Sequence, residues 1–258
     1  MEEYLDFAKN IASYAGKVIN EYFYGDMKIE FKSDKTPVTV ADKMINHYLI
    51  EEVKKVYPSH GVMGEEESYN TDKRFLWVCD PIDGTSSFTR HVPISVFSLA
   101  LVVDGIPMVG VVYDPFLNEM YTAIKGKGAY CNGKPIHVNN LDYGDIGCSV
   151  DYCMWNRAKY DTLEIVKRIR NKVKTCQIGS TAHACMLVAN GSISAELFPG
   201  TAHGNCDIAA SKLIVEEAGG LVTSFHGEEQ LYNQDIDGII ASNGIIHKKL
   251  LSKIKDVY

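Results

Sequence analysis

The sequence lacks the features of a membrane protein, of a disulfide-stapled secreted protein and of a nucleic-acid-binding protein. No apolar run approaches the roughly eighteen residues that a membrane span needs. The seven cysteines form an odd set without a C-x-x-C pair, so we expect no disulfide framework and a location in the reducing cytoplasm. Basic residues are only mildly clustered along the chain, which argues against nucleic acid as a partner.

The composition is that of an ordinary folded chain with an acidic balance. Hydrophobic residues make up 46% of the 258 residues and charged residues 23%, with no low-complexity tract, so the whole chain should fold. The formal net charge is −7. An acidic protein that handles an anionic substrate must supply positive potential locally, and bound metal ions are the obvious source.

The first half of the chain begins with helical patterns and continues with strand patterns. Apolar residues at helical spacing predict amphipathic helices over residues 2–23 and 40–56, and Thr39 is a good N-cap for the second. From Val62 onward, short apolar runs separated by Gly, Pro and Asp predict strands at 75–79, 96–103, 108–113 and 120–123. Asp104-Gly105 indicates a hairpin turn, so this part of the chain should be antiparallel sheet.

The pattern changes after about Asn140. Helices are predicted over residues 157–169, 181–189 and 207–218, alternating with strands near 148, near 173 and at 193–198. We therefore expect an N-terminal metal-binding subdomain with an antiparallel-rich sheet over residues 1–140. A C-terminal mixed α/β subdomain should follow over residues 141–258.

The most informative segment is 77–85, an apolar strand that runs directly into two carboxylates, a glycine and a hydroxyl. Asp80 and Asp83, three apart around a proline-initiated turn, can converge on one hard cation with the Ile82 carbonyl as a further oxygen ligand. Ordinary turn chemistry accounts for the same residues about equally well. An EF-hand is excluded, because Ile82 and His91 would occupy its third and twelfth positions.

Three further features are informative only in combination. Gly84 and Thr85, if they open a short helix through Phe88, would direct N–H groups at a phosphate. Glu65 offers another carboxylate, although an acidic run is usually a solvated surface. Asp207 begins a predicted helix, where a carboxylate also has the structural role of favouring the helix dipole.

Taken together, these motifs resemble the inositol monophosphatase family over nearly the whole chain. The family's G-E-E, D-P-I-D-G-T and W-D-x-A motifs match residues 64–66, 80–85 and 206–209, in the same order and spacing. Its K-x-D-x-(S/T)-P-V-T-x-A-D stretch matches residues 32–42. Four ordered motifs are very unlikely to agree by chance.

The resemblance implies a set of metal ligands. Glu65, Asp80 and the Ile82 carbonyl would hold one Mg²⁺, while Asp80, Asp83 and Asp207 would hold a second one. A third, weaker ion beside Glu65 is expected by analogy, which gives two to three Mg²⁺ ions per chain.

The resemblance also implies catalytic and substrate-binding residues. The Asp42 carboxylate and the Thr85 hydroxyl would orient the attacking water beside the metal ligand Glu65, and the amides of Gly84 and Thr85 would bind the phosphate. The alcohol part of the substrate would lie against Asp83, Gly179, Ser180, Thr181 and His203.

The chain departs from the family pattern at two places. Cys206 stands where most members have Trp, and segment 198–205 contains no carboxylate, whereas members that hydrolyse inositol phosphates carry a Glu in this region. Glu196 is near, but its strand position favours a structural role. Neutral partners discriminate weakly between alcohols, so we expect loose selection among polyols rather than a dedicated inositol monophosphatase.

The resemblance implies an α+β fold of alternating αβαβα layers and a Mg²⁺-dependent phosphomonoesterase. Its substrate would be a small phosphorylated alcohol such as inositol, histidinol or another sugar or polyol phosphate. Alternatives are a 3′-phosphoadenosine 5′-phosphate phosphatase, a fructose-1,6-bisphosphatase or, less favoured, an idle metal- or phosphate-binding regulator. A homodimer is expected at the family level.

Overall fold

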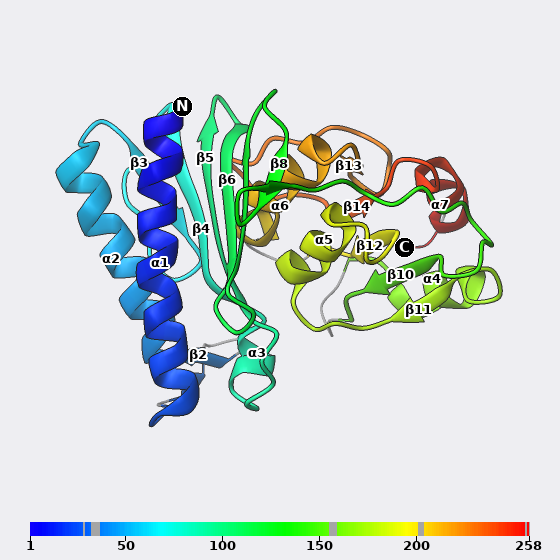
Figure 1. The fold of residues 1–258 in the computed structure, drawn as a ribbon, viewed down its shortest axis with the longest axis horizontal. Coiled ribbons are helices and arrows are strands. Elements are labelled where there is room, and N and C mark those ends of the chain that lie inside the picture. The colour runs from blue at the N-terminus through cyan, green and yellow to red at the C-terminus, as the bar shows by residue number, and fades with distance from the viewer. Residues whose placement is uncertain (28, 32–36, 155–158, 201–203, 256, 258) are drawn as a thin grey trace.

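The computed structural model describes residues 1–258 apart from 28, 32–36, 155–158, 201–203, 256 and 258, and its elements form alternating layers (Figure 1). Helices α1 (Glu2–Tyr24) and α2 (Val40–Val56) cover one face of a seven-stranded sheet. Helices α5 (Thr181–Ala189) and α6 (Gly204–Glu217) lie between that sheet and a five-stranded sheet. Helices α4 (Thr162–Ile169) and α7 (His247–Ile254) cover the outer face of the second sheet. The predicted αβαβα layering is confirmed.

The seven-stranded sheet is antiparallel except at its first pair of strands. Strand β3 pairs parallel with β4, and every later neighbour pair is antiparallel. Asp104 and Gly105 join β5 to β6 with φ angles of 52° and 82°, as expected for the predicted hairpin. The strands are β3 (Gly61–Gly64), β4 (Phe75–Asp83), β5 (Val96–Val103), β6 (Ile106–Asp114), β7 (Glu119–Ile124), β8 (Ala129–Cys131) and β9 (Lys134–Pro135).

The five-stranded sheet is mixed, in the order β11-β10-β12-β14-β13. Strand β10 pairs parallel with β11 and with β12, while β14 pairs antiparallel with β12 and with β13. Its strands are β10 (Ser149–Tyr152), β11 (Lys174–Cys176), β12 (Ala195–Phe198), β13 (Leu221–Thr223) and β14 (Ile239–Ser242). Strands β13 and β14 and helix α7 were not predicted from the sequence.

Two helix starts show how capping sets the boundaries. The Thr39 hydroxyl and the Asp42 carboxylate form a reciprocal capping box at α2, so this helix begins where the sequence predicts. The predicted start of α4 was too early. The Asp161 carboxylate accepts the N–H of Glu164 at 3.1 Å, and the helix therefore begins at Thr162.

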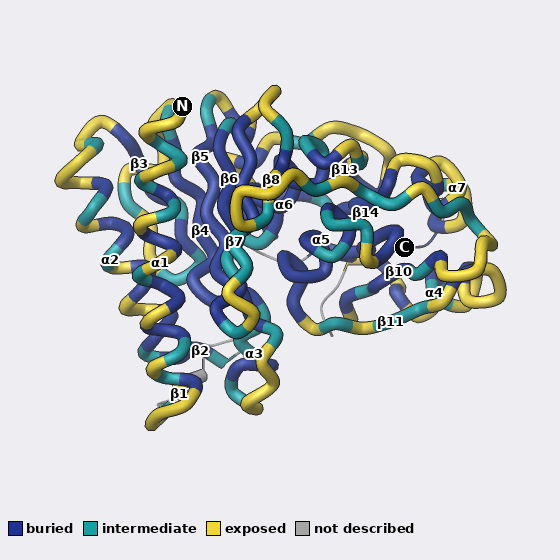
Figure 2. The backbone as a smooth tube through the Cα atoms, in the orientation of Figure 1, coloured by how far each residue is buried: buried dark blue, intermediate teal, exposed yellow. Residues whose placement is uncertain are grey.

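The central strands β4, β5 and β6 are buried on both faces, because helices cover each side of the sheet (Figure 2). One face packs against α1 and α2, and the other packs against α5 and α6. A small antiparallel hairpin, β1 (Ile29–Phe31) with β2 (Pro37–Thr39), precedes α2. Among the described helices, none is long and apolar enough to cross a membrane. The division of the chain at residue 140 stays a prediction.

Candidate active site

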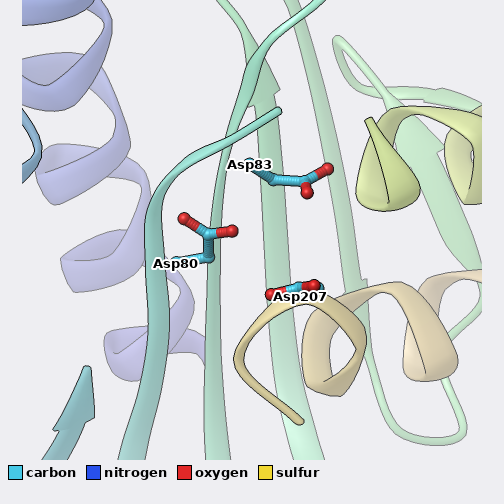
Figure 3. A group of neighbouring side chains, drawn as sticks. All are labelled: Asp80, Asp83 and Asp207. Atoms are coloured by element: carbon cyan, nitrogen blue, oxygen red, sulfur yellow. The ribbon is translucent and has the colours of Figure 1, made fainter. Parts of the chain in front are cut away.

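Three carboxylates converge where β4 ends and α6 begins (Figure 3). Asp80 and Asp83 come from β4, and Asp207 comes from the first turn of α6. Ligand oxygens of the three lie within 4.8 Å of one another. Asp80 is 2% exposed and Asp83 is 6% exposed, whereas Asp207 is partly exposed, so the cluster opens to water on the Asp207 side. We call Asp80, Asp83 and Asp207 the aspartate cluster.

A β-bulge explains how two residues of one strand reach the same side of the sheet. Residues three apart in a regular strand point to opposite faces. Asp80 lies opposite Ser98 and Asp83 lies opposite Val96, so β4 holds one extra residue between these two pairs. The extra residue cancels the alternation. The turn is fixed further by the Ile82 N–H, which donates to Asp80 Oδ1 at 2.9 Å.

Gly84 ends the strand and caps the predicted short helix α3 (Thr85–Phe88). Its φ of 86° is left-handed, and a Cβ at this position would lie 3.0 Å from the Gly179 carbonyl oxygen. The Thr85 hydroxyl donates to the Ile82 carbonyl at 3.0 Å. The Thr85 hydroxyl and the Ile82 carbonyl, both predicted from the sequence to belong to the site, are therefore adjacent.

A turn before α5 reaches the aspartate cluster through Asp83. The Ser180 hydroxyl donates to Asp83 Oδ2 at 2.5 Å, and the Ala182 N–H donates to the same oxygen at 2.7 Å. Gly179 accepts a hydrogen bond from the Ser87 hydroxyl at 3.2 Å. The turn at residues 179–181, which the sequence predicts to lie on the substrate side, thus contacts Asp83 through Ser180. The role of Ala182 was missed, because a backbone N–H leaves no signal in side-chain identity.

Thr181 points elsewhere. Its hydroxyl lies 3.1 Å from Cys153 Sγ, and the side chain is buried. His203 and its neighbours 201 and 202 lie outside the described residues, so the expected contact of His203 with substrate has no structural description. Cys206, which stands in place of the family Trp, is buried with its thiol 3.8 Å from the Met63 carbonyl oxygen.

Glu65 and Asp42 flank the aspartate cluster. Glu65 follows β3, and since β3 and β4 are parallel, their carboxyl ends meet at one edge of the sheet. Its N–H donates to the Cys79 carbonyl at 3.1 Å. Asp42 is fully buried, and its Oδ2 accepts the N–H and the hydroxyl of Thr39 at 2.7 and 2.5 Å. Asp42 Oδ1 has no hydrogen-bond partner among the described residues.

The electrostatics of the region are those of several carboxylates held close together. Burial, followed by the charges of Glu65 and Asp207, raises the pKa of Asp80 well above its usual range. Burial and the charge of Asp83 do the same to the pKa of Asp207. The pKa of Asp83 rises to about 6, chiefly through burial, although its bonds from Ser180 and Ala182 oppose the rise. Bound protons or bound cations would reduce the electrostatic repulsion among these carboxylates.

Alternating αβαβα layers with an acidic cluster at the end of a central strand define a class of metal-dependent phosphatases. Residues 1–257 match the model of the inositol monophosphatase family, and the chain belongs to this family. It is accordingly a phosphoric monoester hydrolase.

Individual relatives agree with this assignment over most of their length. "Inositol monophosphatase 1" of Solanum lycopersicum is 35% identical over 239 residues, covering 89% of this chain and 87% of that protein. "Fructose-1,6-bisphosphatase/inositol-1-monophosphatase" of Thermotoga maritima is 32% identical over 257 residues, covering 98% of this chain and 96% of that protein. The solved structure of a Thermotoga maritima IMPase has a TM-score of 0.88 at 30% identity and covers 99% of this chain and 98% of its own. The extragenic suppressor protein SuhB of Bartonella henselae has a TM-score of 0.89 at 26% identity, covering 98% of this chain and 99% of its own.

Proposed function

We propose that the protein hydrolyses a small phosphorylated alcohol in a Mg²⁺-dependent reaction, with the cations held at the aspartate cluster. The observation that carries the proposal is the convergence of Asp80, Asp83 and Asp207, whose ligand oxygens lie within 4.8 Å of one another. Family membership supports the reaction class, and the acidic geometry supports the dependence on a divalent cation.

The donor set fits Mg²⁺. Mg²⁺ prefers oxygen ligands and uses one or two carboxylates per ion, which matches the buried Asp80 and Asp83 and the partly exposed Asp207, with Glu65 and the Ile82 carbonyl beside them. We propose two to three ions per chain, with Asp80 contributing to both main sites. When bound, Mg²⁺ would neutralise phosphate charge, acidify a water molecule and stabilise the leaving alkoxide.

The chain's own residues would then orient the reactants. We assign the attacking water to the neighbourhood of the Asp42 carboxylate and the Thr85 hydroxyl. Asp42 has one buried oxygen without a partner among the described residues, so it retains an acceptor that a water molecule can satisfy. Gly84 and Thr85 are assigned to the phosphate by the family resemblance.

The alcohol moiety is proposed to be a sugar or polyol. The names of two relatives refer to inositol monophosphate and fructose 1,6-bisphosphate as substrates of those proteins. Glu196, two residues before segment 198–205, is fully buried on β12, which supports its structural role. Loose selection among alcohols is therefore the proposal, with substrate contacts from Gly179 and Ser180, whereas the Thr181 side chain is buried with its hydroxyl beside Cys153 Sγ. A cytoplasmic location and a homodimer are proposed on the resemblance alone.

The test is phosphate release from a panel of monoesters with purified protein. The panel contains inositol 1-phosphate, histidinol phosphate, fructose 1,6-bisphosphate, 3′-phosphoadenosine 5′-phosphate and glycerol phosphate. Chelation should abolish turnover and added Mg²⁺ should restore it. Asp83→Asn should remove most activity, because an amide cannot replace the negative charge, whereas the exposed Asp72→Asn should behave as the wild type.

Two outcomes would contradict this proposal. Full activity in the presence of chelator, or in Asp83→Asn at moderate Mg²⁺, would contradict the metal-dependent mechanism. A preference for inositol 1-phosphate above roughly a hundredfold over all other substrates would overturn loose selection, since that ratio requires strong polar readout of the alcohol.

A further inference from the structure

A second pair of acidic side chains lies in the core of the five-stranded sheet, behind the turn that reaches the aspartate cluster. Asp151 on β10 and Glu196 on β12 are both fully buried. Their strands are parallel neighbours, and the two residues are register partners. They therefore stand side by side on the same face of the sheet.

As two carboxylates, Asp151 and Glu196 would have more acceptor oxygens than donors, with only the weak thiol donors of Cys176 and Cys153 nearby. Asp151 Oδ2 and both carboxyl oxygens of Glu196 are buried and have no hydrogen-bond partner among the described residues. The carboxyls are nevertheless close enough to hydrogen-bond once one of them carries a proton. Burial, followed by the neighbouring Asp151, raises the pKa of Glu196 well above its usual range. A proton on Glu196, donated to Asp151, gives a hydrogen bond to Asp151 Oδ2 and to one of the two Glu196 oxygens.

A metal ion is not an alternative occupant on this geometry. Among the described residues, the aspartate cluster is the one group of three or more acidic, His or Cys side chains whose ligand atoms converge within 4.8 Å. The nearby thiols do not complete a ligand set with Asp151 and Glu196. Cys153 lies against the Thr181 hydroxyl, and the pKa of its thiol is raised well above the usual range, chiefly by burial.

Asp151 is connected directly to the active-site turn. Its Oδ1 accepts the N–H of Ile178 at 2.8 Å. Four residues later, the N–H of Ala182 donates to Asp83, as does the Ser180 hydroxyl between them. The segment 178–182 is thus held by a carboxylate at each end. Asp151 accepts the N–H of Ile178 at its start, and Asp83 accepts the N–H of Ala182 at its end.

We propose that Asp151 and Glu196 share one proton and act as a positioning pair, which fixes segment 178–182 and through it the orientation of Asp83. Glu196 donates to Asp151, and Asp151 accepts from both Glu196 and Ile178. The consequence is a preformed Asp83 at the site assigned to Mg²⁺, so this inference rests on the proposed function for its effect on metal binding. The shared proton and the hydrogen bond from Ile178 to Asp151 do not depend on bound Mg²⁺.

Substitutions at Asp151 separate positioning from packing. Asp151→Leu removes the acceptor of the Ile178 N–H, and Mg²⁺ affinity measured by calorimetry without substrate should fall roughly tenfold, the factor that corresponds to losing about one net hydrogen bond. Asp151→Asn keeps an accepting oxygen for Ile178 and offers N–H to Glu196, so it should restore affinity to within about twofold of wild type. Val150→Ala is the matched control, because Val150 precedes Asp151 on β10 but packs into the core on the opposite face.

Two metal-free measurements test the pair itself. The infrared difference spectrum between the wild type and Glu196→Gln should contain the carbonyl stretch of a buried protonated carboxylic acid, because the protonated acids of the aspartate cluster are common to both proteins and cancel. Amide hydrogen exchange in segment 178–182 should accelerate in Asp151→Leu but not in Val150→Ala. If Asp151→Leu does not fold, Glu196→Met takes its place, with the same direction of change in exchange and in Mg²⁺ affinity.

The outcomes are distinct. Wild-type exchange in the folded Asp151→Leu or Glu196→Met variant, or an infrared spectrum that Glu196→Gln leaves unchanged, overturns the positioning pair whatever the protein's activity. Altered exchange with unaltered Mg²⁺ affinity overturns the link from the turn to Asp83. A wild type that binds no Mg²⁺ refutes the proposed function. The exchange and infrared results would still show whether Asp151 and Glu196 share a proton and fix segment 178–182.

Discussion

Replacing Asp42 by asparagine should stabilise the metal-free protein at alkaline pH and lower its activity with Mg²⁺. Asp42 is fully buried at the start of α2, and its Oδ2 accepts two hydrogen bonds from Thr39. An asparagine retains an accepting oxygen for Thr39 and puts its nitrogen where the unpartnered Oδ1 lies. The capping box is therefore kept, and the negative charge is removed.

The size of the effect follows from the pKa of Asp42. Burial raises this pKa from 3.8 to about 7, although the bonds from Thr39 oppose the rise. Roughly three pKa units correspond to about 4 kcal/mol of unfolding free energy. Because the folded pKa is the higher one, this contribution is fully present below pH 3.8 and is lost as the pH rises through 7. A buried amide N–H without an acceptor costs about 1–3 kcal/mol, so the net gain at pH 8 should be about 1–3 kcal/mol.

The assay is thermal or urea unfolding in chelator at pH 5 and at pH 8. A gain of 1 kcal/mol should raise the melting temperature by about 2–4 °C in a chain of this size, and the gain should vanish or reverse at pH 5. Glu51→Gln, an exposed acid on the same helix, serves as the control. An Asp42→Asn variant that is less stable than wild type at pH 8, or that retains the wild-type pH dependence, would refute the reasoning.

The same variant should lose activity, because an amide cannot accept a proton from the attacking water. If Asp42 and Thr85 act as one unit, Thr85→Ala should cost a similar factor in kcat, and the double variant should cost little more than the worse single one. Additive losses would indicate separate roles. Stability and activity should thus change in opposite directions in Asp42→Asn.

Three further predictions concern glycine strain, metal linkage and acid lability. Gly84→Ala should destabilise the protein more than Gly126→Ala, since both φ angles are near +80° to +86° but only Gly84 has atoms within 4 Å of the added Cβ; equal melting temperatures would contradict this. Mg²⁺ should raise the melting temperature of the wild type, by up to about 2.7 kcal/mol of stabilisation at a hundredfold excess over Kd, and should fail to do so in Asp207→Asn. Burial lowers the pKa of His247 from 6.5 to about 4. The neutral imidazole therefore contributes up to about 3 kcal/mol to the free energy of unfolding above pH 6.5, and this contribution is lost as the pH falls through 4. In His247→Gln, the free energy of urea unfolding should vary less across that pH range.

Elements with local signals were predicted closely. Helices α2 and α5 begin and end at the predicted residues, because Thr39 and Ser180 cap them and apolar spacing continues to the last turn. Strand β5 and the hairpin at Asp104-Gly105 also match, since the turn residues tolerate the positive φ angles that join β5 to β6. Each of these elements is determined by residues within a few positions of its ends.

Features that depend on distant partners were missed. Strands β13 and β14 are short, and they are strands because they pair with each other and with β12. The parallel pairing of β3 with β4, which brings Glu65 to the aspartate cluster, has no local signature. The motif resemblance identified Asp80, Asp83 and Asp207, but the bulge that turns two of them to one side of β4 appears only against the register of β5.

The aspartate cluster also shows why the two halves of the chain cannot be considered separately. Asp80 and Asp83 belong to residues 1–140, whereas Asp207 and the turn that holds Asp83 belong to residues 141–258. One continuous core joins the first sheet, helices α5 and α6 and the second sheet, so neither half buries its inner surface alone. Because that shared layer fixes α5 and α6 against β4, packing between the halves determines the distances among the carboxylates. The core that stabilises the fold is therefore also the scaffold that holds together a cluster whose buried charges oppose folding.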